Sequence, residues 1–125
     1  MREILFRGKR DKKYNKEQEW AYGAPYIDHE GDYIIATDYS KRVVIPETVG
    51  QYTGLTDKNG TKIFEDDIAK NIDGAFLVCW EKEKCAFVMR FLEYPYETLY
   101  LEEMWEDSEV IGNIHDNPEL LGESE

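Results

Sequence analysis

The sequence is poor in residues that anchor a fold through covalent or metal bonds. It has 125 residues but only two cysteines, Cys79 and Cys85, and two histidines, His29 and His115. Two cysteines are too few for a disulfide scaffold, and a chain of this length buries enough surface to fold without one. We therefore expect a single domain over residues 1–125 with no bound cofactor.

Long apolar runs are also lacking. None approaches the roughly 20 residues that a membrane-spanning helix requires. The first residues interleave charged and apolar side chains and do not form the apolar stretch of a signal peptide. These absences predict a soluble cytoplasmic protein with no membrane partner.

Basic residues are outnumbered and unevenly placed. The chain has 15 Lys and Arg against 27 Asp and Glu, a net charge of −12. Residues 93–125 hold eleven acids and no Lys or Arg, whereas residues 1–16 hold seven basic and two acidic residues, a net +5. A field dominated by negative charge repels phosphate backbones, so direct nucleic-acid binding is not expected of the chain as a whole. The opposed ends predict a contact, within one chain or between copies, that involves Lys9, Arg10, Lys12 and Lys13.

Aromatic residues are plentiful and favour strands. They make up 14% of the chain, including nine tyrosines, and short apolar segments alternate with turn signals every eight to twelve residues. The segment Asp57-Lys-Asn-Gly60 is a hairpin turn signal, because Asn and Gly tolerate positive φ. The pattern predicts a mainly β fold, a small barrel or sandwich. Strands are expected at about 3–7, 33–37, 42–45, 51–55, 61–64, 68–72 and 109–114, with residues 20–28 broken by Gly23 and Pro25.

Residues 75–92 predict one more hairpin, with its turn centred on Lys82 and Glu83. In this register the large apolar side chains of both strands share one face, because strand side chains alternate. The predicted partners are Trp80 with Cys85, Val78 with Phe87, and Phe76 with Met89.

Two segments near the carboxyl end have helical signals. Leu101, Met104 and Trp105 are spaced as on a helix, so residues 96–107 are compatible with one short helix. Pro118 stands where a first helical residue is favoured, which predicts a turn of helix ended by Gly122.

Three stretches of the chain resemble the YopX family of phage and prophage proteins: residues 2–7, 49–68 and 110–120. The middle stretch is the most specific, since it joins a Gly-Gln-Tyr-Thr-Gly-Leu strand to the Asp-Lys-Asn-Gly turn. One departure is Asp66, where the family usually has glycine; Asp tolerates left-handed geometry better than most residues. The resemblance implies an SH3-like barrel with additional strands and one or two short helices, expressed inside a bacterial host. It implies no activity and carries over no catalytic residues.

A zinc site would need Cys79, Cys85, His29 and His115 to converge. The spacing of the cysteines argues against it, and the predicted hairpin places Cys79 and Cys85 on opposite faces. We expect two ordinary cysteines, at least one of them in the core.

Clustered carboxylates offer two other chemical interpretations. Glu65, Asp66 and Asp67, joined by Asp57 or Asp73, have the ligand type that magnesium prefers, but successive residues of a turn point in different directions. His115 and Asp116 suggest a general base, but no nucleophile accompanies them. We expect no catalytic or metal-binding residues at these positions.

Partner surfaces are the interpretation that the composition favours. Tyrosine joins a large apolar body to a polar tip and suits interfaces, and the best segment is 94–100. The acidic carboxyl-terminal region offers a surface for a basic protein or an imitation of DNA charge. The predicted surface residues are Tyr94, Tyr96, Tyr100, Glu102, Glu103, Glu106 and Asp107, and the remaining candidate tyrosines are Tyr22, Tyr26, Tyr33, Tyr39 and Tyr52.

The sequence therefore predicts a phage-type protein that is not an enzyme. It is expected to act as an interaction or self-assembling module, binding a second copy of itself or a host or phage protein. An acidic DNA mimic that inhibits a DNA-binding protein is one alternative, and a metal-dependent nucleic-acid enzyme is another.

Overall fold

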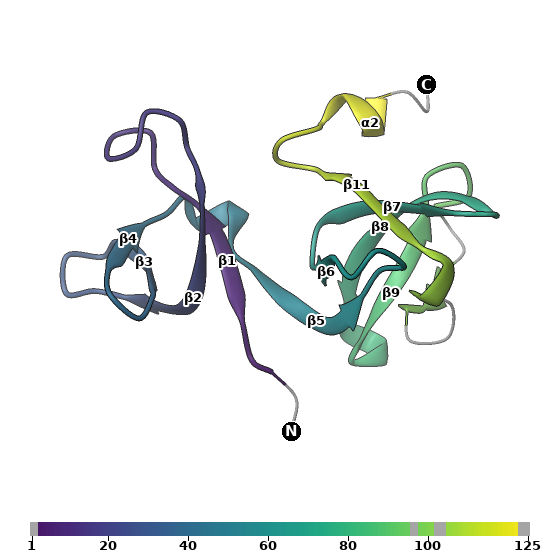
Figure 1. Cartoon of the computed structure of the whole chain (residues 1–125), viewed down its shortest axis with the longest axis horizontal. Helices are drawn as coiled ribbons and strands as arrows, with labels where there is room; N and C mark the ends of the chain where they lie inside the picture. The colour runs from purple at the N-terminus through teal and green to yellow at the C-terminus, as the bar shows by residue number, and fades with distance from the viewer. Residues whose placement is uncertain (1–2, 96–97, 102–104, 123–125) are drawn as a thin grey trace. The chain divides into compact units, whose positions relative to one another are not determined.

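The computed structural model describes residues 3–95, 98–101 and 105–122. Within them the protein is built from antiparallel strands in two sheets (Figure 1). The chain divides into two compact units, which we call unit 1 (Met1–Tyr52) and unit 2 (Thr53–Glu125). The mainly β class is confirmed, while the expectation of a single domain stays a prediction.

Unit 1 contains most of a six-stranded sheet in which β1 to β4 pair in chain order and β5 pairs with β1. The sheet has the order β4-β3-β2-β1-β5-β6, and β5 begins in unit 1 and ends in unit 2. Its core contains Ala21, Ile35 and Val44, against which Phe6 and Val49 pack. The elements of unit 1 are β1 (Phe6–Lys9), β2 (Trp20–Ile27), β3 (Tyr33–Ala36), β4 (Lys41–Val43), η1 (Pro46–Thr48) and the start of β5 (Gly50–Thr56).

The strand β2 is continuous, so the predicted break at Gly23 and Pro25 is wrong. Its first half pairs with β1, ending at Gly23 opposite Phe6, and its second half pairs with β3. Pro25 lacks an N–H but needs none toward β1, because that pairing has already ended. A Cβ on Gly23 would collide with the carbonyl oxygen of Ala36, so close approach of β3 requires glycine there.

The first strand is displaced from its predicted position. The sequence predicts residues 3–7 with an end at Gly8, whereas β1 spans Phe6–Lys9 and includes Gly8. A Cβ on Gly8 would lie 3.0 Å from Cβ of Val44. Here glycine does not end the strand; it makes room for a core side chain.

An isolated β-bridge connects the chain just after β1 to the chain just after β4. Arg10 is bridged to Val44, the Asp11 N–H donates to the Val43 carbonyl (3.0 Å), and the Ile45 N–H donates to the Lys9 carbonyl (2.9 Å). These contacts return the chain beyond β1 to the chain beyond β4. They amount to a single bridge and not a strand pairing, and the predicted SH3-like barrel is not confirmed.

The predicted hairpin at Asp57-Lys-Asn-Gly60 is present between β5 and β6 (Lys62–Phe64). Gly60 has a φ of 85°, which favours glycine. The Asp57 N–H donates to the Thr61 carbonyl (2.8 Å), and the Gly60 N–H donates back to the Asp57 carbonyl (3.0 Å). Local turn chemistry is therefore enough to set this reversal.

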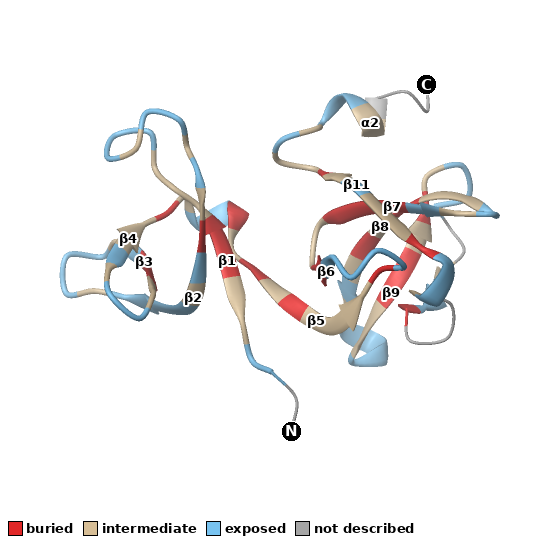
Figure 2. Ribbon diagram, in the orientation of Figure 1, coloured by how far each residue is buried: buried red, intermediate tan, exposed pale blue. Residues whose placement is uncertain are grey.

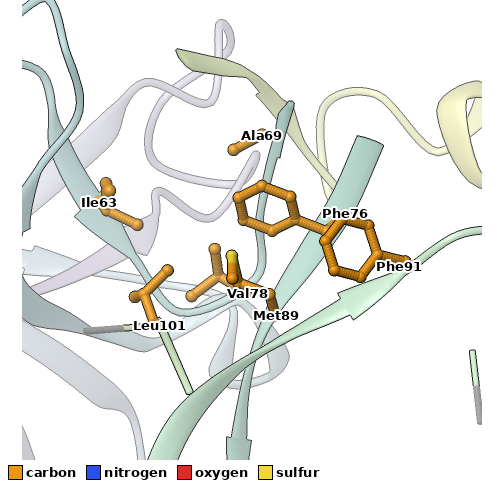
Figure 3. Packing of buried hydrophobic residues seen from close by; sticks show 7 residues of the cluster. All are labelled: Ile63, Ala69, Phe76, Val78, Met89, Phe91 and Leu101. Atoms are coloured by element: carbon orange, nitrogen blue, oxygen red, sulfur yellow. The ribbon is translucent and has the colours of Figure 1, made fainter. Parts of the chain in front are cut away.

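Unit 2 contains a five-stranded antiparallel sheet with the order β10-β9-β8-β7-β11. Figure 3 shows the apolar side chains of its core, with the Phe76 and Phe91 rings edge to face at 5.5 Å between centroids. Figure 2 shows buried segments along β7, β8 and β9. The strands are β7 (Asp67–Asn71), β8 (Gly74–Glu81), β9 (Ala86–Phe91), β10 (Thr98–Tyr100) and β11 (Glu109–Asn113). The buried core residues are Ile63, Ala69, Phe76, Val78, Met89, Phe91 and Leu101.

The β8–β9 hairpin forms as predicted, but its register differs by two residues. The loop is a 3₁₀ turn, η2 (Lys82–Lys84), followed by Cys85 in the left-handed region with a φ of 48°. Four loop residues in place of two move each partner by two positions. Because the side-chain period is two, the predicted apolar face is preserved except for Cys85. The observed partners are Trp80 with Phe87, Val78 with Met89, and Phe76 with Phe91.

The carboxyl-terminal elements agree in part with the sequence. Residues 98–100 of the predicted helix form the strand β10, and Trp105–Asp107 forms a 3₁₀ turn, η3; most of the residues between them lie outside the described residues. The final strand β11 is present, and α2 (Glu119–Gly122) follows Pro118 as expected. No helix of the described residues is long and apolar enough to cross a membrane.

Candidate interaction surfaces

Two basic segments far apart in the sequence come together in unit 1. The hydrogen bond from Asp11 to Val43 places Lys12 and Lys13 next to the end of β4, which carries Lys41 and Arg42. Of these, Lys12, Lys13 and Lys41 are exposed, and the turn that presents them is fixed because the Asp11 carboxylate accepts the Lys13 N–H (2.9 Å). The sequence analysis found the amino-terminal half of this surface and missed the rest. We call Lys9, Arg10, Lys12, Lys13, Lys41 and Arg42 the basic cluster.

Acidic residues also lie beside these cations. Asp11 is part of the same turn, and Glu19, whose side chain is 63% exposed, lies 3.8 Å from Arg10. An ion pair that is exposed to this degree contributes little to stability. The basic cluster therefore offers an anionic partner several cations on one folded unit.

One face of β2 carries three aromatic side chains in a row. Trp20, Tyr22 and Tyr26 share it, because alternate residues of a strand point the same way. Trp20 lies opposite Lys9 and Tyr22 opposite Arg7, and the Arg7 guanidinium lies 4.6 Å from the centre of the Trp20 ring. We call Trp20, Tyr22 and Tyr26 the aromatic face. The even-numbered spacing of these residues could have revealed this face from the sequence. The face was missed because the strand was expected to break at Gly23 and Pro25.

The tyrosines of the predicted partner segment are exposed where they are described. Tyr94 is 48% and Tyr100 is 40% exposed. The Lys84 ammonium lies 5.2 Å from the Tyr100 ring centre and also contacts the Thr98 hydroxyl (3.1 Å). Glu106 and Asp107 are exposed in η3. Tyr96, Glu102 and Glu103 lie outside the described residues. The other four predicted residues are exposed, and their role as a partner surface stays a prediction.

The other candidate tyrosines do not form one patch. Tyr39 is 98% exposed in the loop after β3, and Tyr33 lies opposite Ile27 at the β2–β3 turn, on the face away from Tyr22 and Tyr26. Tyr52 is only 8% exposed and is a core residue.

The division into units separates the charge of the protein. Unit 1 contains nine basic and nine acidic residues and is formally neutral. Unit 2 contains the other six basic and eighteen acidic residues and therefore carries the entire net charge of −12. The acidic character that the sequence suggests for the carboxyl-terminal third thus belongs to a whole folded unit.

Two of the clustered carboxylates are used by the fold. Asp57 is 4% exposed; its side chain accepts the N–H groups of Asn59 (2.9 Å), Thr61 (2.9 Å) and Val110 (2.9 Å). Burial raises the pKa of Asp57, but these three hydrogen bonds and the nearby Lys58 charge outweigh it, so its pKa is lowered. Asp67 is 2% exposed and accepts the Phe64 N–H (2.7 Å).

The structure brings Asp66 and His115 together across 49 residues of sequence. Asp66 Oδ2 lies 3.3 Å from His115 Nε2. The Asp66 backbone also donates to Val78 (2.8 Å) and accepts from Ile114 (3.1 Å). Its φ of 73° shows that the turn keeps the left-handed geometry at the position where the family usually has glycine. The neighbouring Asp116 instead accepts from the Asn113 amide (3.2 Å).

The cysteines do not meet the predicted core placement. Cys79 is half-buried and Cys85 is exposed, so the expectation that at least one lies in the core is wrong. Burial raises the pKa of the Cys79 thiol, and the Arg90 charge opposes this only in part. The raised pKa makes Cys79 a poor nucleophile. Among the described residues no group of three or more His, Cys, Asp or Glu side chains is placed to hold a metal ion.

The fold and its surfaces define an antiparallel β protein with two units, one neutral and one acidic. A family model described as YopX protein matches residues 3–122, and the chain belongs to the YopX family. Its fold is similar to the crystal structure of protein EF1440 from Enterococcus faecalis. The two chains share 25% sequence identity, the match covers 97% of this chain and 99% of that one, and the TM-score is 0.56. A search of curated proteins found no match.

Proposed function

We propose that this protein is a non-enzymatic interaction module of a phage or prophage, acting in the cytoplasm of the bacterial host. The observation that carries the proposal is the partition of charge between the units: the net −12 lies in unit 2, while unit 1 is neutral and presents the basic cluster. A basic cluster on a neutral unit and a net negative charge on the other unit suit recognition of a partner more than they suit stability, since exposed ion pairs contribute little to folding.

The partner that best matches both surfaces is a second copy of the chain. The basic cluster of one copy would contact the acidic unit 2 of another, either reciprocally in a two-fold dimer or head to tail in rings or chains of subunits. Lys12 and Lys13 are exposed in a fixed turn and would enter such a contact without unfolding anything. Electrostatic attraction of this kind weakens as salt rises.

Several observations support a non-enzymatic role. The carboxylates of Asp57 and Asp67 accept hydrogen bonds from backbone N–H groups and so serve the fold. The raised pKa of Cys79 makes its thiol a poor nucleophile. The metal-dependent enzyme stays a prediction, tested by a calorimetric titration of magnesium into the wild type and into Asp66→Asn with Asp67→Asn.

The test is native mass by light scattering at about 50 mM and about 500 mM salt, where the Debye length falls severalfold. Self-assembly predicts an oligomer at low salt that dissociates at high salt. Changing Lys9, Arg10, Lys12 and Lys13 to Glu should dissociate it at low salt as well. The double variant Lys12→Glu with Lys13→Glu changes only exposed turn residues and is the safer form of the experiment.

A matched control changes the same amount of charge on the other unit. Lys58, Lys62, Lys70 and Lys82 are exposed residues of unit 2, and their replacement by Glu should preserve or strengthen the assembly. A wild type that is monomeric at both salt concentrations contradicts self-assembly, as does an oligomer whose mass the basic-cluster variants leave unchanged.

The charge of unit 2 also favours a second candidate, a DNA mimic. Glu106 and Asp107 are exposed in η3 and add to a unit of net −12. A mimic would bind a host or phage DNA-binding protein, and double-stranded DNA would displace it in a salt-dependent competition. A complex that DNA does not displace would exclude mimicry and leave a different protein contact.

A further inference from the structure

The charge of the whole chain does not describe unit 1. The net −12 that argues against nucleic-acid binding resides in unit 2, while unit 1 is formally neutral. Electrostatic repulsion falls off within about 10 Å at ordinary salt. The residues on a surface of unit 1 therefore weigh most in which ligand that surface prefers.

The aromatic face is exposed at its two tyrosines. Tyr22 is 47% and Tyr26 is 39% exposed, and Ala24 stands between them on the same face, opposite Ala36. Four residues of strand separate the tyrosines by roughly 13 Å, several times the ~3.4 Å spacing of stacked bases. Two planar groups could therefore be held at once, one on each ring, with the small side chains of Ala24 and Ala36 between them.

Cations border the same face. Lys9 and Arg7 lie opposite Trp20 and Tyr22 on β1, and Lys41 lies opposite Ala36 on β4. Arg7 is 6% exposed and fixes the Trp20 ring, whereas Lys41 is exposed. Two acids, Asp28 and Asp32, stand opposite each other at the far end of this face, and the Asp28 carboxylate accepts the N–H groups of Glu30 (3.0 Å) and Asp32 (2.9 Å).

We propose that the aromatic face of unit 1 binds single-stranded nucleic acid. Bases would stack on Tyr22 and Tyr26, and the phosphate backbone would lie toward Lys9 and Lys41. Exposed aromatic rings on a sheet next to cations are the two elements that such binding requires. An acidic peptide would contact the cations but not the rings of Tyr22 and Tyr26. A nucleic acid would contact both, so it explains more of the features of this face. The ligand is single-stranded because paired bases offer no free faces.

The experiment is fluorescence anisotropy of the full chain with a labelled oligothymidylate of about twenty nucleotides, at about 50 mM salt. We expect saturable binding that weakens with salt. Tyr22→Ala with Tyr26→Ala should weaken it at least about tenfold, since each stacked base contributes substantially. Tyr22→Phe with Tyr26→Phe keeps both rings and should bind as the wild type does. Lys41→Gln should lower the salt slope by about one ion.

The matched control is Tyr33→Ala with Tyr39→Ala. Both tyrosines are exposed in unit 1 and lie off the aromatic face, so binding should not change. Circular dichroism of each variant separates lost binding from lost folding, and the Phe variant separates the ring from the hydroxyl.

Three outcomes would overturn the proposal. The first is no binding by the wild type at low salt. The second is binding that the Ala variant retains, which would indicate the basic cluster acting by charge alone. The third is equal affinity for double-stranded DNA of the same length. Self-assembly is tested separately by light scattering, whose variants share Lys9 with this proposal but leave Tyr22 and Tyr26 unchanged.

Discussion

At the scale of single residues, the carboxylate of Asp57 connects two parts of unit 2 that are distant in sequence. It accepts hydrogen bonds from the N–H groups of Asn59 and Thr61 in its own turn. It also accepts one from Val110, which is 53 residues away near the start of β11. The sequence identified Asp57 as a turn residue and as a marginal metal candidate. The third hydrogen bond could not be predicted, because it depends on where β11 lies.

Replacing Asp57 with Asn should destabilise the protein by roughly 2–3 kcal/mol. The amide retains one acceptor oxygen but turns an NH₂ group toward an N–H donor, and hydrogen bonds to charged groups contribute about 1.5–3 kcal/mol. Urea denaturation measures the loss. Asp73→Asn changes an exposed acid of the next turn and should alter the free energy of unfolding by less than about 0.5 kcal/mol.

This stabilisation by Asp57 should depend on pH. A carboxylate whose pKa is lowered in the folded state stabilises it above the pKa of the unfolded chain, and the contribution is lost as the pH falls through the lower folded value. The difference in unfolding free energy between wild type and Asp57→Asn should therefore be constant from pH 7 to about pH 5 and shrink below about pH 4. A difference that persists unchanged to about pH 2 would contradict it.

Asp66 provides a second residue-scale prediction because its φ of 73° is unfavourable for most side chains. Asp66→Gly and Asp66→Ala both remove the carboxylate that contacts His115. Only glycine relieves the backbone, so the Gly variant should be more stable than the Ala variant by about 1 kcal/mol. Equal midpoints in urea would show that the turn relaxes out of the left-handed region.

At the scale of elements, the strands that were predicted well are those set by local patterns. The apolar face of β8 and β9 followed from alternation, and the turn before β6 followed from Asn59 and Gly60. The length of the β8–β9 loop did not follow, because it depends on Cys85 adopting a left-handed conformation that its residue type does not favour. The continuity of β2 was not predicted for a related reason. Gly23 and Pro25 are tolerated in this strand because of the neighbouring strand β3, whose position the local sequence does not give.

Gly23→Ala should disrupt the β2–β3 pairing. The new Cβ would meet the Ala36 carbonyl, and a backbone atom cannot rotate away as a flexible side chain can. We expect a loss of at least about 2 kcal/mol in unit 1. Trp20 fluorescence in a background with Trp80→Phe and Trp105→Phe follows unit 1 alone in urea.

The control for this prediction is Ala24→Ser in the same background. Ala24 is the next residue of β2 and is exposed, so the midpoint should move little. A Gly23→Ala midpoint as close to wild type as that of the control would mean that β3 can shift to accommodate the methyl group.

At the scale of the whole molecule, the two units should respond differently to salt. Unit 2 concentrates eighteen acids against six basic residues, so its charges repel one another, whereas unit 1 is balanced. Raising salt from about 20 mM to about 500 mM should raise the melting temperature of unit 2 by a few degrees and that of unit 1 by less.

Tryptophan fluorescence resolves the two responses. Trp20→Phe leaves the emission of Trp80 and Trp105 in unit 2, and the converse double variant leaves that of Trp20 in unit 1. Equal shifts of both signals would show that salt acts on the chain generally and not through the excess acids of unit 2.

The sequence by itself determined the features that arise between near neighbours. Alternation fixed the mainly β class and the faces of β8 and β9, and turn chemistry fixed the Asp57 to Gly60 reversal, because each depends on a few adjacent residues. The tertiary structure alone decided which distant groups meet: Asp57 with Val110, Asp66 with His115, and the Arg10 segment with β4. Such contacts follow from strand order and loop length, which depend on packing over the whole unit and leave no local pattern in the sequence.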